Sequence, residues 1–256
     1  NTRKTIDIAI IGKYVNLKDA YKSLDEALIH GGIQNKVKIN LIRIESDKLK
    51  LNNIGTKLKN ASGILIPGGF GKRGTEGKIA CIKYAREKKI PFLGICFGMQ
   101  MAIIEFARNV LKINNAGSTE LDKKIYPVIG LINEWSKDGV IIKGTDRDLG
   151  GTMRLGLYNA VLKNNSAIKN IYKLNKIRER HRHRYEVNNN LREKFEKKGL
   201  MFSGMSPDNK LPEIIELKNH PWFIGVQFHP EFKSRPLKPH PLFSSFIKAS
   251  ISHYEK

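Results

Sequence analysis

The sequence predicts an α/β fold in which a mainly parallel central sheet is flanked by helices on both faces, with additional antiparallel strands in the second half. In the first half, short apolar runs alternate with segments whose apolar residues recur at helical spacing, which is typical of strands buried between two helical layers. In the second half, residues 212–217 and 222–228 are strand-like runs joined by a short turn. The chain has 256 residues, which suits a single domain spanning residues 1–256.

The elements of the first half follow from local patterns. Residues 6–15 are an apolar run that predicts a buried strand. We expect the next helix to have Asp19 as its N-cap and to stop at Gly31-Gly32. The later elements expected are strands over 37–44 and 63–67, a Gly-rich loop over 68–74, a helix over about 75–88, a strand over 90–95 and a helix over about 99–110. Parallel strands place the loop and the segment after residue 95 on the same edge of the sheet.

The second half is less regular. The pattern loosens over residues 114–120, and residues 150–156 resemble a strand entered through a glycine hinge. A charged surface helix is predicted over 188–199. The chain ends with a predicted helix over 241–254 that has one apolar face.

The composition limits the classes of partner. The formal net charge is +22, but the lysines are scattered along the whole chain without aromatic residues spaced for stacking, so we expect no nucleic-acid partner. No apolar run is long enough to span a membrane, and no charged-then-apolar leader is present. Two cysteines are too few for a disulfide framework, which favours a reducing, cytoplasmic location. A first residue of Asn indicates a piece of a longer chain.

A candidate nucleophile lies where a strand is expected to meet a helix. Cys96 stands between Gly94 and Gly98, and a tight turn needs small residues on either side of the nucleophile. The helix N-terminus favours negative charge, so this thiol should ionise more readily than a free one. The pattern alone is equally compatible with a buried, inert cysteine.

A base and its orienting acceptor are present in residues 227–231. His229 can take a proton from the thiol and return it to a leaving group, and Glu231 can fix the imidazole tautomer. Residues two apart at the end of an extended segment point the same way, so we expect these side chains to lie together. His181 and His183 could suggest a metal pair, but no further ligands at metal spacing are visible and the interleaved arginines would repel a cation, so we expect no metal site.

The motifs 67–71, 94–100 and 227–231 together resemble those of class I (triad) glutamine amidotransferases, in the family's order and spacing. Nearly the whole chain is similar to the amidotransferase domains of CTP synthases, through residues 12–15, 19–21, 73–78, 150–156, 180–188 and 220–222. Residues 163–176 are the least similar part. The resemblance implies a flavodoxin-like parallel sheet and hydrolysis of L-glutamine.

The resemblance also implies roles for particular residues. Cys96 would attack the glutamine amide, with His229 as base and then acid and Glu231 orienting it. Backbone N–H groups of Gly69 and Phe97 would form the oxyanion hole. The glutamine pocket would consist of Gly69, Phe97, Gly98, Met99, Gln100, Glu120 and Arg184, with Glu120 facing the substrate ammonium. Phe70 and Arg73 resemble the part of the family's lid that holds GTP, the allosteric activator.

Partners and alternatives follow from the same resemblance. It implies an N-terminal synthetase domain that aminates UTP to CTP with ATP and Mg²⁺, a tetramer for the full-length protein, and no cofactor in this domain. The chain contains no Gly-x-x-x-x-Gly-Lys-Ser/Thr phosphate loop of its own. Another triad amidotransferase (the GMP synthetase type), a γ-glutamyl hydrolase or a non-catalytic regulatory module are the alternatives. The complete Cys96, His229 and Glu231 set and the Arg-rich block over 180–188 argue against them.

Overall fold

The computed structural model describes residues 4–13, 21–131, 134–137, 140–143 and 153–255. Its helices are α1 (Lys22–Gln34), α2 (Ile54–Leu58), α3 (Thr75–Lys88), α4 (Phe97–Asn109), α5 (Ala167–Tyr172), α6 (Arg192–Lys197) and α7 (Pro241–Tyr254), with 3-10 helices η2 (Ser46–Lys48), η3 (Asn189–Leu191) and η4 (Pro230–Lys233). Its strands are β1 (Thr5–Gly12), β2 (Lys38–Glu45), β3 (Gly63–Ile66), β4 (Phe92–Ile95), β5 (Ala116–Ser118), β6 (Tyr126–Leu131), β7 (Glu134–Lys137), β8 (Val140–Lys143), β9 (Arg154–Leu162), β10 (Lys176–His183), β11 (Tyr185–Val187), β12 (Leu200–Met205), β13 (Pro212–Leu217) and β14 (Phe223–Val226).

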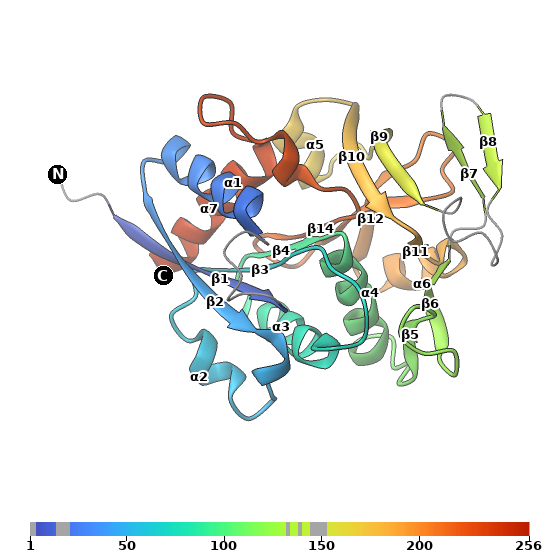
Figure 1. Ribbon diagram of the computed structural model, residues 1–256, viewed down its shortest axis with the longest axis horizontal. Coiled ribbons are helices and arrows are strands. Elements are labelled where there is room, and N and C mark those ends of the chain that lie inside the picture. Colours follow the sequence, from blue (N-terminus) through green and yellow to red (C-terminus); the bar gives the residue numbers. More distant parts are fainter. Residues whose placement is uncertain (1–3, 14–20, 132–133, 138–139, 144–152, 256) are drawn as a thin grey trace.

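A nine-stranded sheet forms the centre, in the order β10-β9-β12-β13-β14-β4-β3-β1-β2. The strands from β14 to β2 pair in parallel, whereas β10, β9, β12 and β13 pair antiparallel with their neighbours and with β14. A three-stranded sheet of β11, β6 and β5 and the β7–β8 hairpin lie beyond it in the second half of the chain (Figure 1). The predicted fold class is therefore confirmed.

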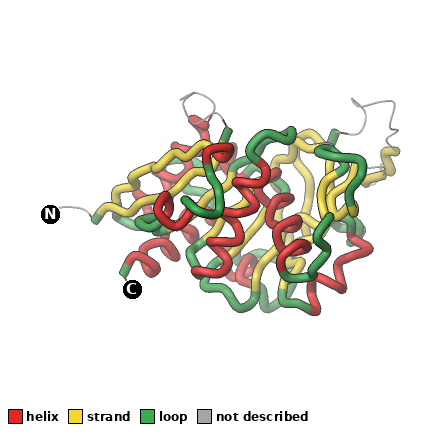
Figure 2. Tube along the Cα trace, turned by 90° about the horizontal axis from the view of Figure 1, so that it is seen from below, coloured by secondary structure: helices red, strands yellow, loops and turns green. Residues whose placement is uncertain are grey.

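Helices cover both faces of the parallel part. On one face α1 and α7 pack together over a core that includes Leu28, Phe243 and Phe246. On the other face α3 and α4 cover a core that includes Ile82, Phe92 and Ile103. Figure 1 shows the sheet between these two layers, and Figure 2 shows the strands and the helices turned by 90°. Burial on both sides explains why these strands read as continuous apolar runs in the sequence.

Two expectations for the start of the chain, one for the first helix and one for the first strand, were wrong. Helix α1 runs to Gln34, so Gly31 and Gly32 lie inside it. The missing Cβ atoms allow close packing, because a Cβ at Gly31 would lie 3.0 Å from the Phe243 backbone and one at Gly32 would lie 2.6 Å from Cγ1 of Ile39. The first strand ends at Gly12 rather than at residue 15, and Asp19 lies outside the described residues.

The second half differs more from expectation. Residues 114–120 contain the short strand β5, which pairs with β6. The predicted helix over 188–199 is η3 followed by the six-residue α6, because buried Leu191 and Phe195 turn the segment onto the core. Strand β14 is also shorter than predicted, and the proposed hinge over residues 150–151 falls outside the described part of the chain. No helix in the described ranges has the length and apolar character needed to cross a bilayer.

Candidate active site

The three sequence motifs meet at the carboxyl edge of the parallel strands. The Gly-rich loop follows β3, Cys96 follows β4, and His229 comes three residues after β14. Strand β4 pairs in parallel with both β3 and β14, so the segments after these strands are neighbours. A Cβ at Gly68 would lie 2.7 Å from Cε1 of His229 and 3.7 Å from Cβ of Cys96, which shows how closely the loop packs on both. The expectation that loop and turn lie side by side is confirmed.

Cys96 sits on a strained turn between β4 and α4. Its φ is 50° and its ψ is −103°, a backbone conformation that L-residues rarely adopt. A Cβ at Gly98 would lie 2.2 Å from the Ile66 carbonyl oxygen, and one at Gly94 would lie 2.8 Å from the Gly98 carbonyl carbon. Small residues are therefore required on both sides of Cys96, as the pattern predicted.

His229 and Glu231 form a hydrogen-bonded pair, with 2.8 Å between Nδ1 and Oε1. The geometric reason given for this pairing was wrong, because His229 caps the 3-10 helix η4 and Glu231 lies within it. The tight helical turn, rather than an extended segment, brings the carboxylate back to the imidazole. The backbone N–H of His229 also donates to the Arg180 carbonyl at 2.8 Å, which ties the turn to β10.

The electrostatics favour a charged imidazole at His229. Burial lowers the pKa of His229, but the hydrogen bonds and negative charges of Cys96 and Glu231 outweigh it and raise this pKa to about 10. The other cysteine, Cys81, is fully buried in α3, where desolvation raises the pKa of its thiol to about 12. A thiolate is therefore suppressed at Cys81.

The residues assigned to the glutamine pocket divide into two groups. Phe97 is the first residue of α4, and a Cβ at Gly69 would lie 3.9 Å from its ring, so the Gly-rich loop lies against the Phe97 side chain. The side chains of Met99 and Gln100 are instead buried beneath the turn. The Gln100 amide donates to the Tyr185 carbonyl at 3.0 Å.

Glu120 and Arg184 both lie close enough to Tyr185 for their charges to act on it. Burial and the negative charge of Glu120 raise the pKa of Tyr185, whereas the positive charge of Arg184 lowers it. Glu120 also accepts a hydrogen bond from the Gly71 backbone N–H at 2.8 Å, and so tethers the Gly-rich loop. Nε of Arg184 is buried and has no hydrogen-bond partner among the residues described.

The loop residues Phe70 and Arg73 are at the surface, with 72% of Phe70 exposed. Lys13 bonds to the carbonyl oxygens of Phe70 and Gly71, and Arg73 donates to the Lys13 carbonyl at 2.9 Å. Lys78 is buried below them with its ammonium 5.1 Å from the centre of the Phe97 ring.

The sequence reasoning missed Lys13 and Lys78. Desolvation, with the nearby charges of Lys13 and Arg73, lowers the pKa of Lys78 to about 7. Both lie in segments that resemble the family, 12–15 and 73–78, but lysines among so many others carry no signal that would assign them a role.

The histidines of the Arg-rich block face each other in the interior. Nδ1 of His181 lies 2.9 Å from Nε2 of His183, so these two ring nitrogens are hydrogen-bonded to each other. Desolvation and the charge of Arg154 hold the pKa of both well below the usual value, which keeps them neutral. In the described ranges no group of three or more His, Cys, Asp or Glu residues is arranged to hold a metal ion.

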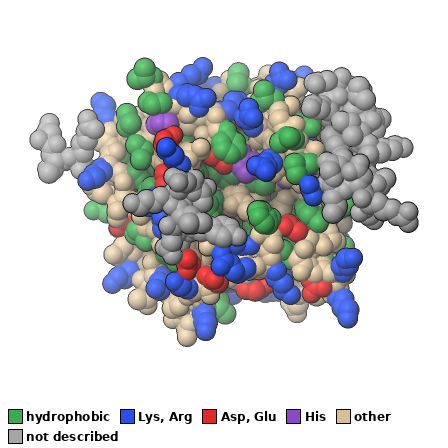
Figure 3. Space-filling view, viewed as in Figure 1, with side chains coloured by type: hydrophobic (Ala, Val, Ile, Leu, Met, Phe, Trp, Pro, Cys, Tyr) green, Lys and Arg blue, Asp and Glu red, His purple; other side chains and the backbone are tan. Residues whose placement is uncertain are grey.

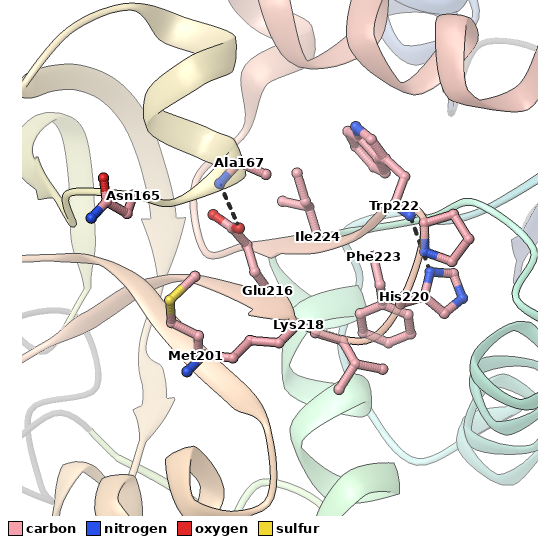
Figure 4. Close-up of a pocket in the computed structure, with 11 residues that line it drawn as sticks. Asn165, Ala167, Met201, Glu216, Lys218, His220, Trp222, Phe223 and Ile224 are labelled. Atoms are coloured by element: carbon pink, nitrogen blue, oxygen red, sulfur yellow. Dashed lines mark hydrogen bonds between the residues drawn. The ribbon is translucent and has the colours of Figure 1, made fainter. Parts of the chain in front are cut away.

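One hollow borders the segment that follows β14, and another borders the segment that precedes it. One, of about 570 Å³, borders His229 and is lined by Met153, Leu155, Arg180, His181, Arg182 and Phe232 as well. The other, of about 280 Å³, lies at the amino end of β14, where Glu216 accepts from the Ala167 backbone and His220 from that of Trp222 (Figure 4). On the face shown in Figure 3, Lys and Arg side chains are spread among apolar and acidic ones rather than gathered in one patch.

Comparisons with known proteins identify the family of this chain. The family "Glutamine amidotransferase class-I" matches residues 16–249. A CTP synthase of Pelagibacter ubique is 75% identical over 99% of this chain, and one of Bartonella tribocorum is 59% identical over 96%. The matches cover 47% and 46% of those proteins, so the chain spans about half the length of these curated relatives.

Solved structures place the fold in the same group. The Trypanosoma brucei CTPS glutaminase domain with bound acivicin superimposes with a TM-score of 0.87 at 34% identity, covering 96% of this chain and 94% of that one. A glutamine amidotransferase of Thermotoga maritima, at 11% identity with a TM-score of 0.52, shares the fold. The chain therefore belongs to the class I glutamine amidotransferase family and, within it, to the CTP synthase glutaminase domains.

Proposed function

We propose that this chain hydrolyses L-glutamine to glutamate and ammonia through a γ-glutamyl thioester on Cys96. The observation that carries the proposal is the strained turn that presents Cys96 beside the His229–Glu231 pair, at the edge where β4 and β14 end. The raised pKa of His229 supports an imidazolium in the resting state, which suits a proposed thiolate at Cys96. The trypanosomal relative, which is named a glutaminase domain, shares the fold and most of the chain length.

The steps follow from the charges of this resting state. The Cys96 thiolate attacks the amide carbon, and the oxygen becomes negative near the N–H groups of Gly69 and Phe97. The His229 imidazolium gives its proton to the leaving nitrogen, which departs as ammonia and leaves the thioester. The neutral imidazole then takes a proton from water, the hydroxide attacks the thioester carbon, and glutamate leaves as the thiolate is restored.

Two opposite charges suit the amino-acid end of the substrate. Glu120 would hold the α-ammonium, and Arg184, with its buried and unpaired Nε, would hold the α-carboxylate. Gly98, Met99 and Gln100 would form the floor of the pocket beneath the turn. Because Glu120 also tethers Gly71, substrate binding would be coupled to the position of the Gly-rich loop.

The ammonia would serve the amination of UTP to CTP by an N-terminal synthetase domain with ATP and Mg²⁺. The relatives, about twice as long as this chain, support such a domain, and residues 1–256 would form the glutaminase domain of a cytoplasmic, tetrameric enzyme. The exposed Phe70 ring and the nearby Arg73 suit a purine nucleotide, so GTP would act here as the activator.

Glu231→Ala is expected to lower glutamine hydrolysis while leaving it at least about tenfold above that of a Cys96→Ala variant. An imidazole that is not held by the carboxylate still accepts a proton part of the time. Ammonia release from saturating L-glutamine measures this. Glu231→Gln, which keeps an acceptor for Nδ1–H, should lie between Glu231→Ala and wild type. Wild-type activity in Glu231→Ala would remove this carboxylate from the mechanism.

Acivicin is expected to label Cys96 and not Cys81. Cys96 is 5% exposed and lies on the turn at the site, whereas the Cys81 thiol is fully buried and has a pKa of about 12. Mass spectrometry of peptides after labelling, with and without excess L-glutamine, identifies the modified residue and tests protection by substrate. Labelling at Cys81, or labelling of Cys96 that glutamine does not slow, would contradict the proposed function.

A further inference from the structure

A line of buried amide groups leads from the backbone of β11 to the candidate nucleophile. Gln100 and Gln227 are 3% and 0% exposed, so neither amide can exchange its partners for bulk water. Nε2 of Gln100 donates to the Tyr185 carbonyl at 3.0 Å and to Oε1 of Gln227 at 3.2 Å. Nε2 of Gln227 in turn lies 3.6 Å from Sγ of Cys96.

The carbonyl at the start of this line sets the orientation of both amides. A backbone carbonyl can only accept, so Gln100 must turn its NH₂ group toward Tyr185. The same NH₂ group faces Gln227, which must therefore present its oxygen to Gln100 and its own NH₂ group to the sulfur. A flip of either amide would set two oxygens or two NH₂ groups against each other in the interior, at the cost of an unsatisfied buried group.

We propose that Gln227 is a catalytic residue whose side-chain N–H donates a hydrogen bond to the Cys96 thiolate, and that Gln100 is a positioning residue that aims this N–H. The assignment rests on the proposed function, in which the Cys96 thiolate is the nucleophile. It assigns Gln227 a chemical role in the reaction. It also explains why a polar side chain is retained at a fully buried position.

The other groups described around the Cys96 sulfur do not supply a neutral side-chain donor. The N-terminus of α4 contributes its dipole, and His229, paired with Glu231, contributes the opposite charge. On β10 the Arg182 carbonyl lies 4.0 Å from Sγ and can accept only from the thiol form, while His181 and His183 are held neutral. Arg180 offers its carbonyl to the His229 N–H rather than to the sulfur. Gln227 is thus a neutral donor that stabilises the thiolate without placing a second cation beside His229.

The donor also suits both halves of the reaction. A hydrogen bond to a charged acceptor is stronger than one to a neutral acceptor, so this one strengthens when the sulfur is a thiolate and weakens when it is a thioester. It therefore favours the return of the sulfur as leaving group when water attacks. Loss of the donor should slow both the alkylation of free Cys96 and the breakdown of the thioester.

The test is the pH dependence of Cys96 alkylation by iodoacetamide in a Cys81→Ala background, where Cys96 is the single thiol. Gln227→Met keeps an unbranched side chain of similar length and removes the donor. We expect the apparent thiol pKa to rise by about one unit, which lowers the thiolate fraction about tenfold at pH values below it. Gln100→Met, which leaves the Gln227 amide unaimed, should give a smaller rise in the same direction.

A matched control separates this role from a packing effect. Ser203 on β12 is equally buried and its hydroxyl has no hydrogen-bond partner in the described part of the chain, so Ser203→Ala should leave the alkylation profile unchanged. An unchanged profile in Gln227→Met, with wild-type thermal unfolding, would overturn the inference. If Cys96→Ala still hydrolysed glutamine, the proposed function would fail. If Cys96→Ala were inactive but Gln227→Met kept the wild-type alkylation profile, the proposed function would stand and only the role of Gln227 would be refuted.

Discussion

Cys96→Ala is expected to lower the kcat of glutamine hydrolysis by more than about ten-thousandfold, because no other group can form the covalent intermediate. The imidazole of His229 and the backbone N–H groups of Gly69 and Phe97 remain in place. These groups could at most polarise the amide for direct attack by water. Release of ammonia at saturating L-glutamine, measured with enough protein to detect a rate this low, gives the comparison.

The other cysteine provides the matched control. Cys81→Ala makes the same substitution in α3, where the side chain packs in the core and does not reach the site, so its activity should equal that of wild type. Cys96→Ser should resemble Cys96→Ala, since a serine hydroxyl at this position is much harder to ionise than a thiol. Substantial hydrolysis by Cys96→Ala would exclude a thioester on this residue.

Arg154→Met is expected to destabilise the folded chain by about 3–5 kcal/mol near neutral pH, because it leaves uncompensated buried charge. Arg154 is 1% exposed and donates to Glu186 at 3.0 Å and to Glu213 at 2.7 Å. Both carboxylates are themselves buried. Urea unfolding followed by circular dichroism measures the free energy of unfolding of variant and wild type.

The loss of unfolding free energy in Arg154→Met should depend on pH, in a direction that follows from the pKa shifts of the two carboxyl groups. Burial raises the pKa of Glu186 well above the usual value and also raises that of Glu213, although Arg154 opposes both shifts. A carboxyl whose pKa is higher in the folded state holds its proton there more tightly, so its contribution to stability is complete below the unfolded pKa and falls as pH rises. Removing Arg154 raises both pKa values further, and the deficit of the variant should therefore be smaller at pH 5.5 than at pH 8.

The two neutral histidines beside this cluster act in the opposite direction. The pKa values of His181 and His183 are lowered by burial, so acid destabilises both wild type and variant as the unfolded chain takes up protons. The quantity to compare is therefore the difference in unfolding free energy between variant and wild type at each pH. Lys197→Met, which removes an exposed partner of Glu193, should change the unfolding free energy little at either pH. If Arg154→Met lost the same unfolding free energy at pH 5.5 and at pH 8, buried carboxylate charge could not be the cause of its instability.

Local sequence determined the parallel half of the fold. Helices α3 and α7 have the predicted bounds, and β3 and β4 differ from prediction by at most two residues, because strands buried on both faces and amphipathic helices have distinct apolar periods. The turn at Cys96 was also predictable. The requirement for glycine at residue 94 arises within a few residues, from the backbone of Gly98, whereas the one at residue 98 also comes from the Ile66 carbonyl at the end of β3.

Tertiary packing decided the features in which distant segments meet. Gly31 and Gly32 signal a helix end locally, yet contacts with Phe243 and Ile39 use them for close packing instead. The His229–Glu231 pair was predicted, but the helical turn that forms it was not, because a short 3-10 helix has no strong local period.

The surroundings of the Cys96 sulfur likewise depend partly on local sequence and partly on tertiary packing. The sequence by itself identified Cys96, His229 and Glu231 as candidates, since spacing and residue type carry that chemistry. It contained no sign that Gln100 and Gln227, which are 127 positions apart, align their amides on the sulfur. That arrangement, like the burial of Lys78 and of the Arg154 cluster, depends on which side chains the folded sheet and helices exclude from water, and desolvation of a group is a property of the packed structure rather than of its neighbours in the chain.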